Sequence, residues 1–301
     1  MLRLNTGLIY RENAGIEEPQ VHMNTTNTPT RWLLKKSARA AVATTSITAC
    51  MQVNKAPRVR ALTYHRFGNA TRDPFCVTVQ SFDKQMAYIA NRGLALSLGE
   101  FTDFLAGRNS IAPDSVLVTI DDGFRSTYSA ALPVLRHYGI PAVAFISPGL
   151  IEAPASATEP YVSWDEARML HEGGIEIGSH SMTHRSVARI SDEQAREEIL
   201  HSREILEARI GQPISAFAYP FGTRADYNES TSSIIRNAGY ECAFTSQHGA
   251  ISATSDAFTL PRIKVEGGEN LWLFKRIACG GLDAWRWIDR ALWRIQASDS
   301  G

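Results

Sequence analysis

Two groups of side chains in this 301-residue sequence are of the types that bind a divalent metal or transfer a proton. Two carboxylates are adjacent at Asp121 and Asp122, and two histidines, His180 and His184, are separated by three residues. Two imidazoles and a carboxylate make a three-ligand metal site with open coordination positions, which is the catalytic pattern. Neighbouring aspartates at a strand end point in different directions, so one can bind the metal while the other acts as a base. Such a metal activates water and polarises a carbonyl group.

Each motif has a simpler interpretation when it is taken alone. Asp-Asp-Gly is typical of a turn with a helix cap, and two histidines in a polar segment are about as often solvated as bound to metal. Here each motif directly follows an apolar run that predicts a strand. Their joint occurrence at separate strand ends favours a metal site.

Short apolar runs alternate with helical segments from residue 60 onwards, which predicts a parallel α/β domain. Helices are expected at 81–92 and 127–138, each ended by a glycine, and after the capping boxes Ser163-x-x-Glu166 and Ser191-x-x-Gln194. These alternations favour a distorted or incomplete (β/α) barrel over two separate folds. The expected strands are 61–64, 94–98, 116–120, 142–146, 175–178, 216–219 and 242–244.

Folds of this class carry their chemistry at the carboxyl ends of the strands. Four such ends bear polar or turn-forming residues: His65, Asp121-Asp122, His180 and the Pro-Phe-Gly turn around Phe221. That turn leaves backbone N–H groups free for an oxyanion, or it is a plain turn with an aromatic ring packed beneath it. The sequence supports both interpretations of the turn.

Two of these motifs resemble the polysaccharide deacetylase (NodB-homology) family of carbohydrate esterases. Residues 119–124 (TIDDGF) and 179–184 (SHSMTH) are similar to its first two motifs in order and separation, and the likeness spans residues 60–265. The resemblance implies a barrel of the NodB-homology type that removes acetyl groups from N-acetylated sugars with a divalent metal, commonly zinc. It also implies that Asp121 is the general base and that Asp122, His180 and His184 hold the metal.

The third motif departs from the commoner family pattern. Ala218 stands two residues before Pro220, where the family usually has an arginine that orients the base. The usual Leu-x-x-His motif is also missing, because His248 is the last histidine of the chain. His248 lies in a polar segment, and we interpret it as a loop histidine.

Both gaps close if the chain resembles the circularly permuted branch that includes the biofilm poly-N-acetylglucosamine deacetylases. In that branch a Tyr-His element on an early strand supplies the acid, so His65 is our candidate to protonate the leaving amine as an imidazolium. Arg262 would reach Asp121 in place of the missing arginine, although a surface or ion-pair role explains it equally well. By the same resemblance, Phe221 N–H would bind the oxyanion, and Tyr219 is a further substrate candidate.

The ends of the chain are expected to lie outside the catalytic domain. We expect a poorly ordered extension with a basic amphipathic segment at 1–58, the deacetylase domain at 59–268 and an aromatic-rich helical tail at 269–301. The basic segment would rest on the domain or, like the tail, contact a membrane surface. We expect a cytoplasmic or peripherally membrane-associated protein, with lipoprotein export through a signal-peptidase site at Cys50 as the alternative.

Composition excludes several other classes of function. Lys plus Arg and Asp plus Glu both number 31, so nucleic acid is not an expected partner. The four separated cysteines indicate neither a cysteine zinc site nor a disulfide framework. The resemblance to the deacetylase family implies a metal-dependent hydrolase, with zinc as the metal, that releases acetate from an N-acetylhexosamine polysaccharide or oligosaccharide. The alternatives are a deacylase of a lipid-linked sugar in envelope glycan assembly and a non-catalytic carbohydrate-binding homologue.

Overall fold

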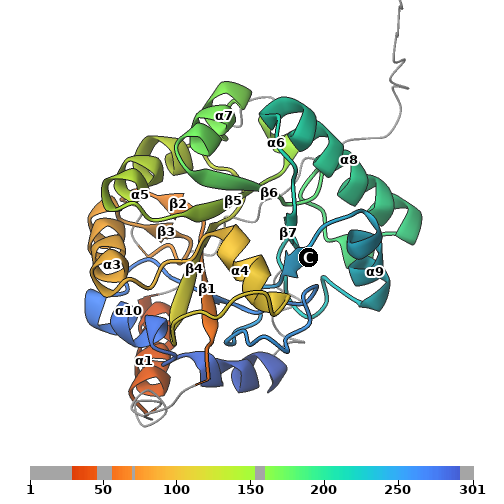
Figure 1. The fold of residues 1–301 in the computed structure, drawn as a ribbon. Helices are drawn as coiled ribbons and strands as arrows, with labels where there is room; N and C mark the ends of the chain where they lie inside the picture. The colour runs from red at the N-terminus through yellow and green to blue at the C-terminus, as the bar shows by residue number, and fades with distance from the viewer. Residues whose placement is uncertain (1–28, 46–55, 70–71, 153–159, 292–301) are drawn as a thin grey trace, which may run out of the picture.

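Seven parallel strands form the centre of the molecule. A computed structural model describes residues 29–45, 56–69, 72–152 and 160–291, and its main sheet has the order β8-β7-β6-β5-β4-β1-β9 (Figure 1). The two edges of this sheet meet, because Phe244 bridges Leu260 in parallel and Leu260 N donates to Ala243 O at 2.9 Å. The expected incomplete (β/α) barrel is therefore confirmed. The strands are β1 Val59–Tyr64, β4 Ser115–Ile120, β5 Ala142–Ile146, β6 Ile175–Ser179, β7 Ala216–Ala218, β8 Cys242–Phe244 and β9 Arg262–Lys264.

Helices surround the barrel and connect its strands, as the right-handed crossovers of parallel strands require. A separate two-stranded sheet, β2 Arg66–Phe67 and β3 Cys76–Val77, lies beyond the end of β1. The helices are α1 Pro29–Thr45, α3 Val79–Arg92, α4 Leu98–Leu105, η1 Thr127–Ala131, α5 Leu132–Tyr138, α6 Pro148–Glu152, α7 Trp164–Glu172, η2 Val187–Arg189, α8 Asp192–Ile210, α9 Glu229–Asn237, α10 Leu271–Ala278 and η3 Asp283–Trp285.

The local signals predicted most of these elements. Both expected capping boxes are present, with Ser163 and Ser191 accepting from the backbone three residues on. The strand expected at 94–98 is wrong: only Ala95 bridges the sheet, and Ser97 starts α4 with a third capping box. The short strand β9 was not predicted at all.

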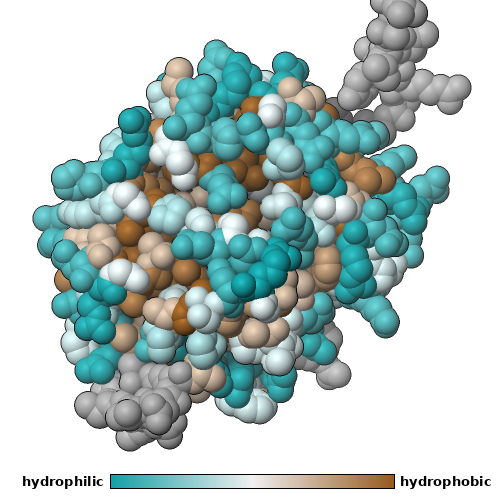
Figure 2. Space-filling view, viewed as in Figure 1, coloured by the Kyte–Doolittle hydropathy of each residue, from teal (hydrophilic) through white to brown (hydrophobic). Residues whose placement is uncertain are grey.

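The alternation of side chains along each strand divides the core into two layers. One layer fills the barrel interior, and α4 closes the amino ends of the strands, with the Phe101 ring stacked on Phe244 at 5.6 Å. The other layer packs the outer face of the sheet against the helices. From the α4 side polar side chains cover much of the surface, with apolar side chains showing between them (Figure 2). The carboxyl ends of the strands remain for chemistry.

The basic segment near the N-terminus forms α1, which lies beside α10 (Figure 1). Its Arg39 is 1% exposed and contacts the barrel, so this helix rests on the domain. In the aromatic tail Phe274 and Trp285 are buried, whereas Trp272 and Trp287 are exposed. Cys50 and its proposed cleavage site lie outside the described residues. None of the helices in the described ranges is both long and apolar enough to span a bilayer.

Candidate active site

The register of three adjacent strands brings His65, Asp121 and Arg262 to one end of the barrel. Tyr64 pairs with Ile120, and Asp121 N donates to Tyr64 O at 2.9 Å, so His65 and Asp121 follow neighbouring strand ends. On the other side of β1, Ala61 pairs with Arg262. Because strand side chains alternate, residues two apart share a face. The face that Ala61 directs into the barrel is therefore the face that carries His65.

Asp121 and Arg262 form a buried, two-point ion pair. The guanidinium Nη1 and Nη2 atoms each lie 2.7 Å from one carboxylate oxygen of Asp121. Arg262 also donates from Nε to Thr245 O at 2.9 Å and from Nη1 to Thr119 Oγ1 at 3.2 Å, which fixes its plane. Burial raises the pKa of Asp121, but the opposing Arg262 charge prevails and the pKa lies below its ordinary value. Asp121 is thus held ionised and oriented.

Asp122, His180 and His184 come together as a candidate metal group. Oδ1 of Asp122 lies 3.2 Å from Nε2 of His184 and 3.4 Å from Nε2 of His180, and one ligand atom from each residue falls within 4.8 Å of the others. His180 Nδ1 lies 2.7 Å from Ala218 O. Because a carbonyl oxygen only accepts, Nδ1 carries the proton and Nε2 is left free as a ligand. This donor set fits a divalent metal.

The backbone at the site adopts left-handed conformations. Of the six non-glycine residues with positive φ in the described part of the chain, four lie here: Asp122 at 72°, Ser181 at 61°, His184 at 62° and Phe221 at 60°. Such conformations are unfavourable for residues with a Cβ atom and persist only where surrounding contacts impose them. Their clustering indicates that these turns are shaped to aim side chains and N–H groups at a common point.

The candidate acid His65 directly follows β1, in surroundings that disfavour the charged imidazolium. Its ring packs edge-on against Phe75 with centroids 4.9 Å apart. Burial lowers the pKa of His65 to about 4, against the opposing charges of Asp122 and Asp121. At neutral pH the imidazole is therefore neutral in the resting site and becomes a proton donor only after it gains a proton.

The structure does not bring Tyr219 into the site, contrary to the expectation of a substrate contact. Tyr219 follows inward-facing Ala218 and therefore points outward, into the layer between sheet and helices. Its hydroxyl donates to Phe258 O at 3.0 Å and lies 3.0 Å from Ser232 Oγ. Burial raises its pKa to about 12.

Phe221 lies at the rim of the site. Its ring is 36% exposed and packs against the His184 imidazole with centroids 5.1 Å apart. Among the described residues, its backbone N–H has no hydrogen-bond acceptor. The free N–H required for an oxyanion site is therefore present. His248, by contrast, is buried elsewhere, with Nδ1 2.9 Å from Asp289.

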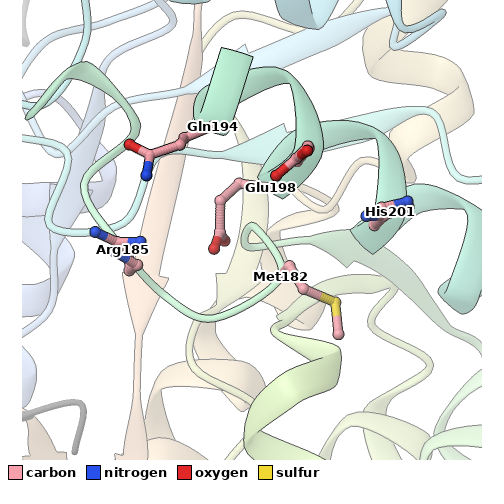
Figure 3. A pocket seen from close by; sticks show the side chains of 6 residues that line it. Met182, Arg185, Gln194, Glu198 and His201 are labelled. Atoms are coloured by element: carbon pink, nitrogen blue, oxygen red, sulfur yellow. The ribbon is translucent and has the colours of Figure 1, made fainter. Parts of the chain in front are cut away.

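Glu198 of α8 is a supporting residue that the motifs did not identify. Its carboxylate accepts from Thr183 N at 2.8 Å and from Thr183 Oγ1 at 2.6 Å, immediately before His184. Figure 3 shows Glu198 projecting from α8 into the curve of the loop between Met182 and Arg185. The sequence held one signal for this residue: Glu198 lies next to Ile199 on the buried face of a helix, and a buried carboxylate requires a partner.

Asp226 and Lys264 are two further residues that the motifs did not identify. Asp226 is fully buried and accepts from Ser186 Oγ at 2.7 Å and from Thr223 N at 3.0 Å, which joins the loop after His184 to the Pro-Phe-Gly turn. Lys264 places its ammonium 3.9 Å from the centre of the Phe75 ring. Burial lowers the pKa of Lys264 to about 8, which still leaves the ammonium mostly protonated at neutral pH. Lys264 therefore places a positive charge near His65.

Comparison with known proteins points to one family. The family model described as polysaccharide deacetylase matches residues 108–243. YxkH of Bacillus subtilis (strain 168), whose name assigns it to the polysaccharide deacetylases, is 26% identical over 237 residues, covering 78% of this chain and 81% of YxkH. The chain is therefore similar to the polysaccharide deacetylase family over residues 108–243 and, through YxkH, over most of its length. Polysaccharide deacetylases are hydrolases that act on carbon–nitrogen bonds other than peptide bonds.

Another relative is the poly-beta-1,6-N-acetyl-D-glucosamine N-deacetylase of Staphylococcus aureus (strain MRSA252). It is 23% identical over 212 residues, which cover 67% of this chain and 72% of the relative. Two solved structures share the polysaccharide deacetylase barrel: the Streptococcus pyogenes deacetylase PplD (TM-score 0.67, 23% identity, 74% of this chain and 97% of PplD) and IcaB from Ammonifex degensii (TM-score 0.64, 24% identity, 75% and 98%). The likeness therefore extends over most of the barrel.

The family match divides the candidate site in two. The matched span contains Asp121 and the three candidate metal ligands, whereas His65 precedes it and Arg262 follows it. His65 directly follows β1 and Arg262 begins β9, and these two strands pair with each other. The part of the site outside the family model is thus completed by the two strands at the ends of the barrel sequence.

The contacts of Glu198 predict an effect on metal binding. Glu198→Leu leaves Thr183 N–H without its acceptor and releases the turn that aims His184, so metal affinity should fall by about 10–100-fold. The neighbouring Glu197 is exposed, and Glu197→Leu is the matched control. Calorimetric titration of the metal-free protein with Zn²⁺ measures both. Equal affinities in the two variants would contradict a positioning role for Glu198.

Proposed function

We propose that this chain is a divalent-metal-dependent N-deacetylase that releases acetate from polysaccharides or oligosaccharides containing N-acetylhexosamine. The observation that carries the proposal is the candidate metal group of Asp122, His180 and His184 beside an ionised carboxylate, Asp121, whose two oxygens are held by Arg262. The S. aureus relative named a poly-beta-1,6-N-acetyl-D-glucosamine N-deacetylase supports N-acetylglucosamine polymers as the substrate class.

Asp122, His180 and His184 would hold the metal, for which we propose Zn²⁺ because zinc favours two imidazoles, one carboxylate and open positions. When bound, the metal supplies Lewis acidity that activates water and polarises the acetyl carbonyl. The Ala218 carbonyl keeps the free electron pair of His180 on Nε2 by accepting from Nδ1–H.

Asp121 is the proposed general base. Its pKa lies below the ordinary carboxyl value, so it is ionised at neutral pH, and its orientation is fixed. It is therefore ready to accept the proton of an attacking water. Its neighbour Asp122 adopts a φ of 72°, which turns the chain sharply between the two carboxylates. This turn is the physical basis for two adjacent aspartates having different tasks.

Phe221 N–H and His65 are proposed to act on the two sides of the bond that breaks, the acetyl oxygen and the leaving sugar nitrogen. The unsatisfied N–H of Phe221 would donate to the acetyl oxygen as negative charge develops there. That same charge would raise the pKa of the neutral His65 imidazole, so that His65 takes up a proton from the solvent during the reaction, while the proton from the attacking water stays on Asp121 until the products leave. His65 would then protonate the leaving sugar nitrogen.

Acetate release from N-acetylglucosamine oligomers is the direct test of the function. Zinc-loaded protein should release acetate, chelation should abolish the release, and added Zn²⁺ should restore it. Asp121→Asn should lower turnover by about 10²–10⁴-fold while the bound metal remains at the wild-type amount, because Asp121 is not among the proposed ligands. Acetate release that survives both chelation and this substitution would contradict the proposed mechanism.

A change of leaving group isolates the role of His65. His65→Ala should lose about 10²–10⁴-fold in N-deacetylation but hydrolyse an aryl acetate near the wild-type rate, because a phenolate leaves without being protonated. Asp121→Asn is the comparison, since it should lose both reactions. An equal loss of both reactions in His65→Ala would remove His65 from the acid role.

The Arg262 ion pair predicts the acidic limit of activity. In the wild type the acid limb of kcat/KM from Asp121 should lie below the ordinary Asp pKa of about 3.9, since the folded-state pKa is lowered. Arg262→Met removes the largest charge that opposes the effect of burial on Asp121, so the pKa of Asp121 rises and the limb should move to higher pH. Arg262→Lys keeps a cation and should retain a lower limb than the Met variant. Profiles measured at saturating Zn²⁺ decide; coincident limbs in all three proteins would refute the assignment.

A further inference from the structure

A buried cluster of charges outside the catalytic site joins the N-terminal helix to the end of the barrel. Glu266 and Glu269 follow β9, and their side chains are 2% and 0% exposed. Three cations of α1 meet them: Arg39 Nε lies 2.6 Å from Glu269, Lys36 Nζ 3.0 Å from Glu266 and Lys35 Nζ 2.7 Å from Glu266. Burial alone would raise the pKa of Glu266, but these cations hold it well below its usual range. Both acids therefore depend on α1 for their counter-charges.

Arg39 is the member of this cluster that also contacts the barrel backbone. Its Nη2 donates to the carbonyl oxygen of Lys264 at 2.7 Å, and Lys264 is the last residue of β9. Glu269, held by Arg39, accepts in turn from Glu266 N at 3.0 Å. Arg39 thus fixes the chain on both sides of the turn that follows β9.

Strand β9 is short and is paired on both sides. It is three residues long and pairs with β1 from Ala61 to Thr63. On its other side, Arg262 N donates to Gln247 O at 2.8 Å. Yet β9 carries the guanidinium that orients Asp121. A small displacement of this strand would separate the two 2.7 Å contacts of that ion pair.

We propose that α1 is a working part of the active site, in which Arg39 is a positioning residue that holds β9 so that Arg262 meets Asp121. The proposal rests on the proposed deacetylase function for its activity readout. Arg39 acts through the Lys264 carbonyl and Glu269. A chain shortened to begin at Cys50 would lack α1, and on this proposal it would retain the candidate metal ligands but lose the ordered base. The basic segment is then a structural requirement of the active enzyme rather than a leader that the enzyme can lose.

The closest matched control is Arg60. It is also a buried arginine with two carboxylate partners, Asp114 and Asp283, at 2.6 and 2.9 Å. It lies near the amino end of β1, at the end of the barrel away from the site. Arg60→Met should therefore lower stability, as Arg39→Met does, without moving β9 relative to Asp121.

Two measurements on the full-length protein test the proposal. In Arg39→Met, kcat per folded, zinc-loaded molecule should fall at least tenfold, with zinc content unchanged; Arg60→Met should keep the wild-type kcat. Arg39→Lys retains a charge for Glu269 and should recover part of the loss, and it also serves if the Met variant does not fold. Equal kcat values for Arg39→Met and Arg60→Met would overturn the proposal.

Hydrogen–deuterium exchange supplies a readout that does not depend on the reaction. The backbone amides of 262–265 should exchange faster in Arg39→Met than in Arg60→Met, while those of 116–121 should remain protected in both. Faster exchange at β9 in a protein without acetate release would refute the proposed function and leave the bracing by α1 standing. Unchanged exchange at β9 would refute the bracing, whatever the activity.

Discussion

The buried contact between Asp121 and Arg262 is the interaction on which the arrangement of the site depends. A carboxylate this deeply buried is stable as an anion only where a fixed cation meets it, and a single guanidinium supplies both charge and geometry here. The pair also spans the interior face of three strands, because Arg262 reaches past β1 to the end of β4. Removing either partner would leave an uncompensated charge in the barrel, so orientation of the base and integrity of the fold have the same physical origin.

The metal side of the site is organised by a different principle. Its ligands lie on turns with left-handed backbone conformations, and carboxylates from other elements hold those turns. Glu198 of α8 fixes Thr183, and Asp226 joins the loop after His184 to the turn of Phe221. The conformational cost of the turns is offset by buried, charge-assisted hydrogen bonds. Glu198 on α8 and Asp226 in the loop before α9 thus determine how accurately the loops present the candidate ligands.

The sequence predicted the parts of this protein whose signals are local. Strand alternation, capping boxes and the Asp-Asp and His-x-x-x-His spacings each involve residues close together in the chain. The run at 94–98 misled because its alternating leucines imitate a strand, whereas the capping box of Ser97 and Glu100 starts a helix. The prediction that Tyr219 contacts substrate was wrong. Ala216 and Ala218 occupy the inward face of β7, so Tyr219 faces outward. β9 was missed because a three-residue Arg-Ile-Lys segment becomes a strand only through its partner β1, and the role of Arg39 depends on acids 230 residues away.

The closing position of β9 bears on the order in which this molecule matures. Asp121 and Arg262 are 141 residues apart, and β9 follows every other strand of the barrel in the chain. During synthesis from the N-terminus, the three candidate metal ligands are complete long before the arginine that orients the base emerges. Contacts of such large separation form late, since the intervening chain must be ordered first. A nascent chain that already has its candidate ligand set therefore lacks the arginine that orients the proposed base, and on the proposed function it gains hydrolytic competence only with the strand that closes the barrel.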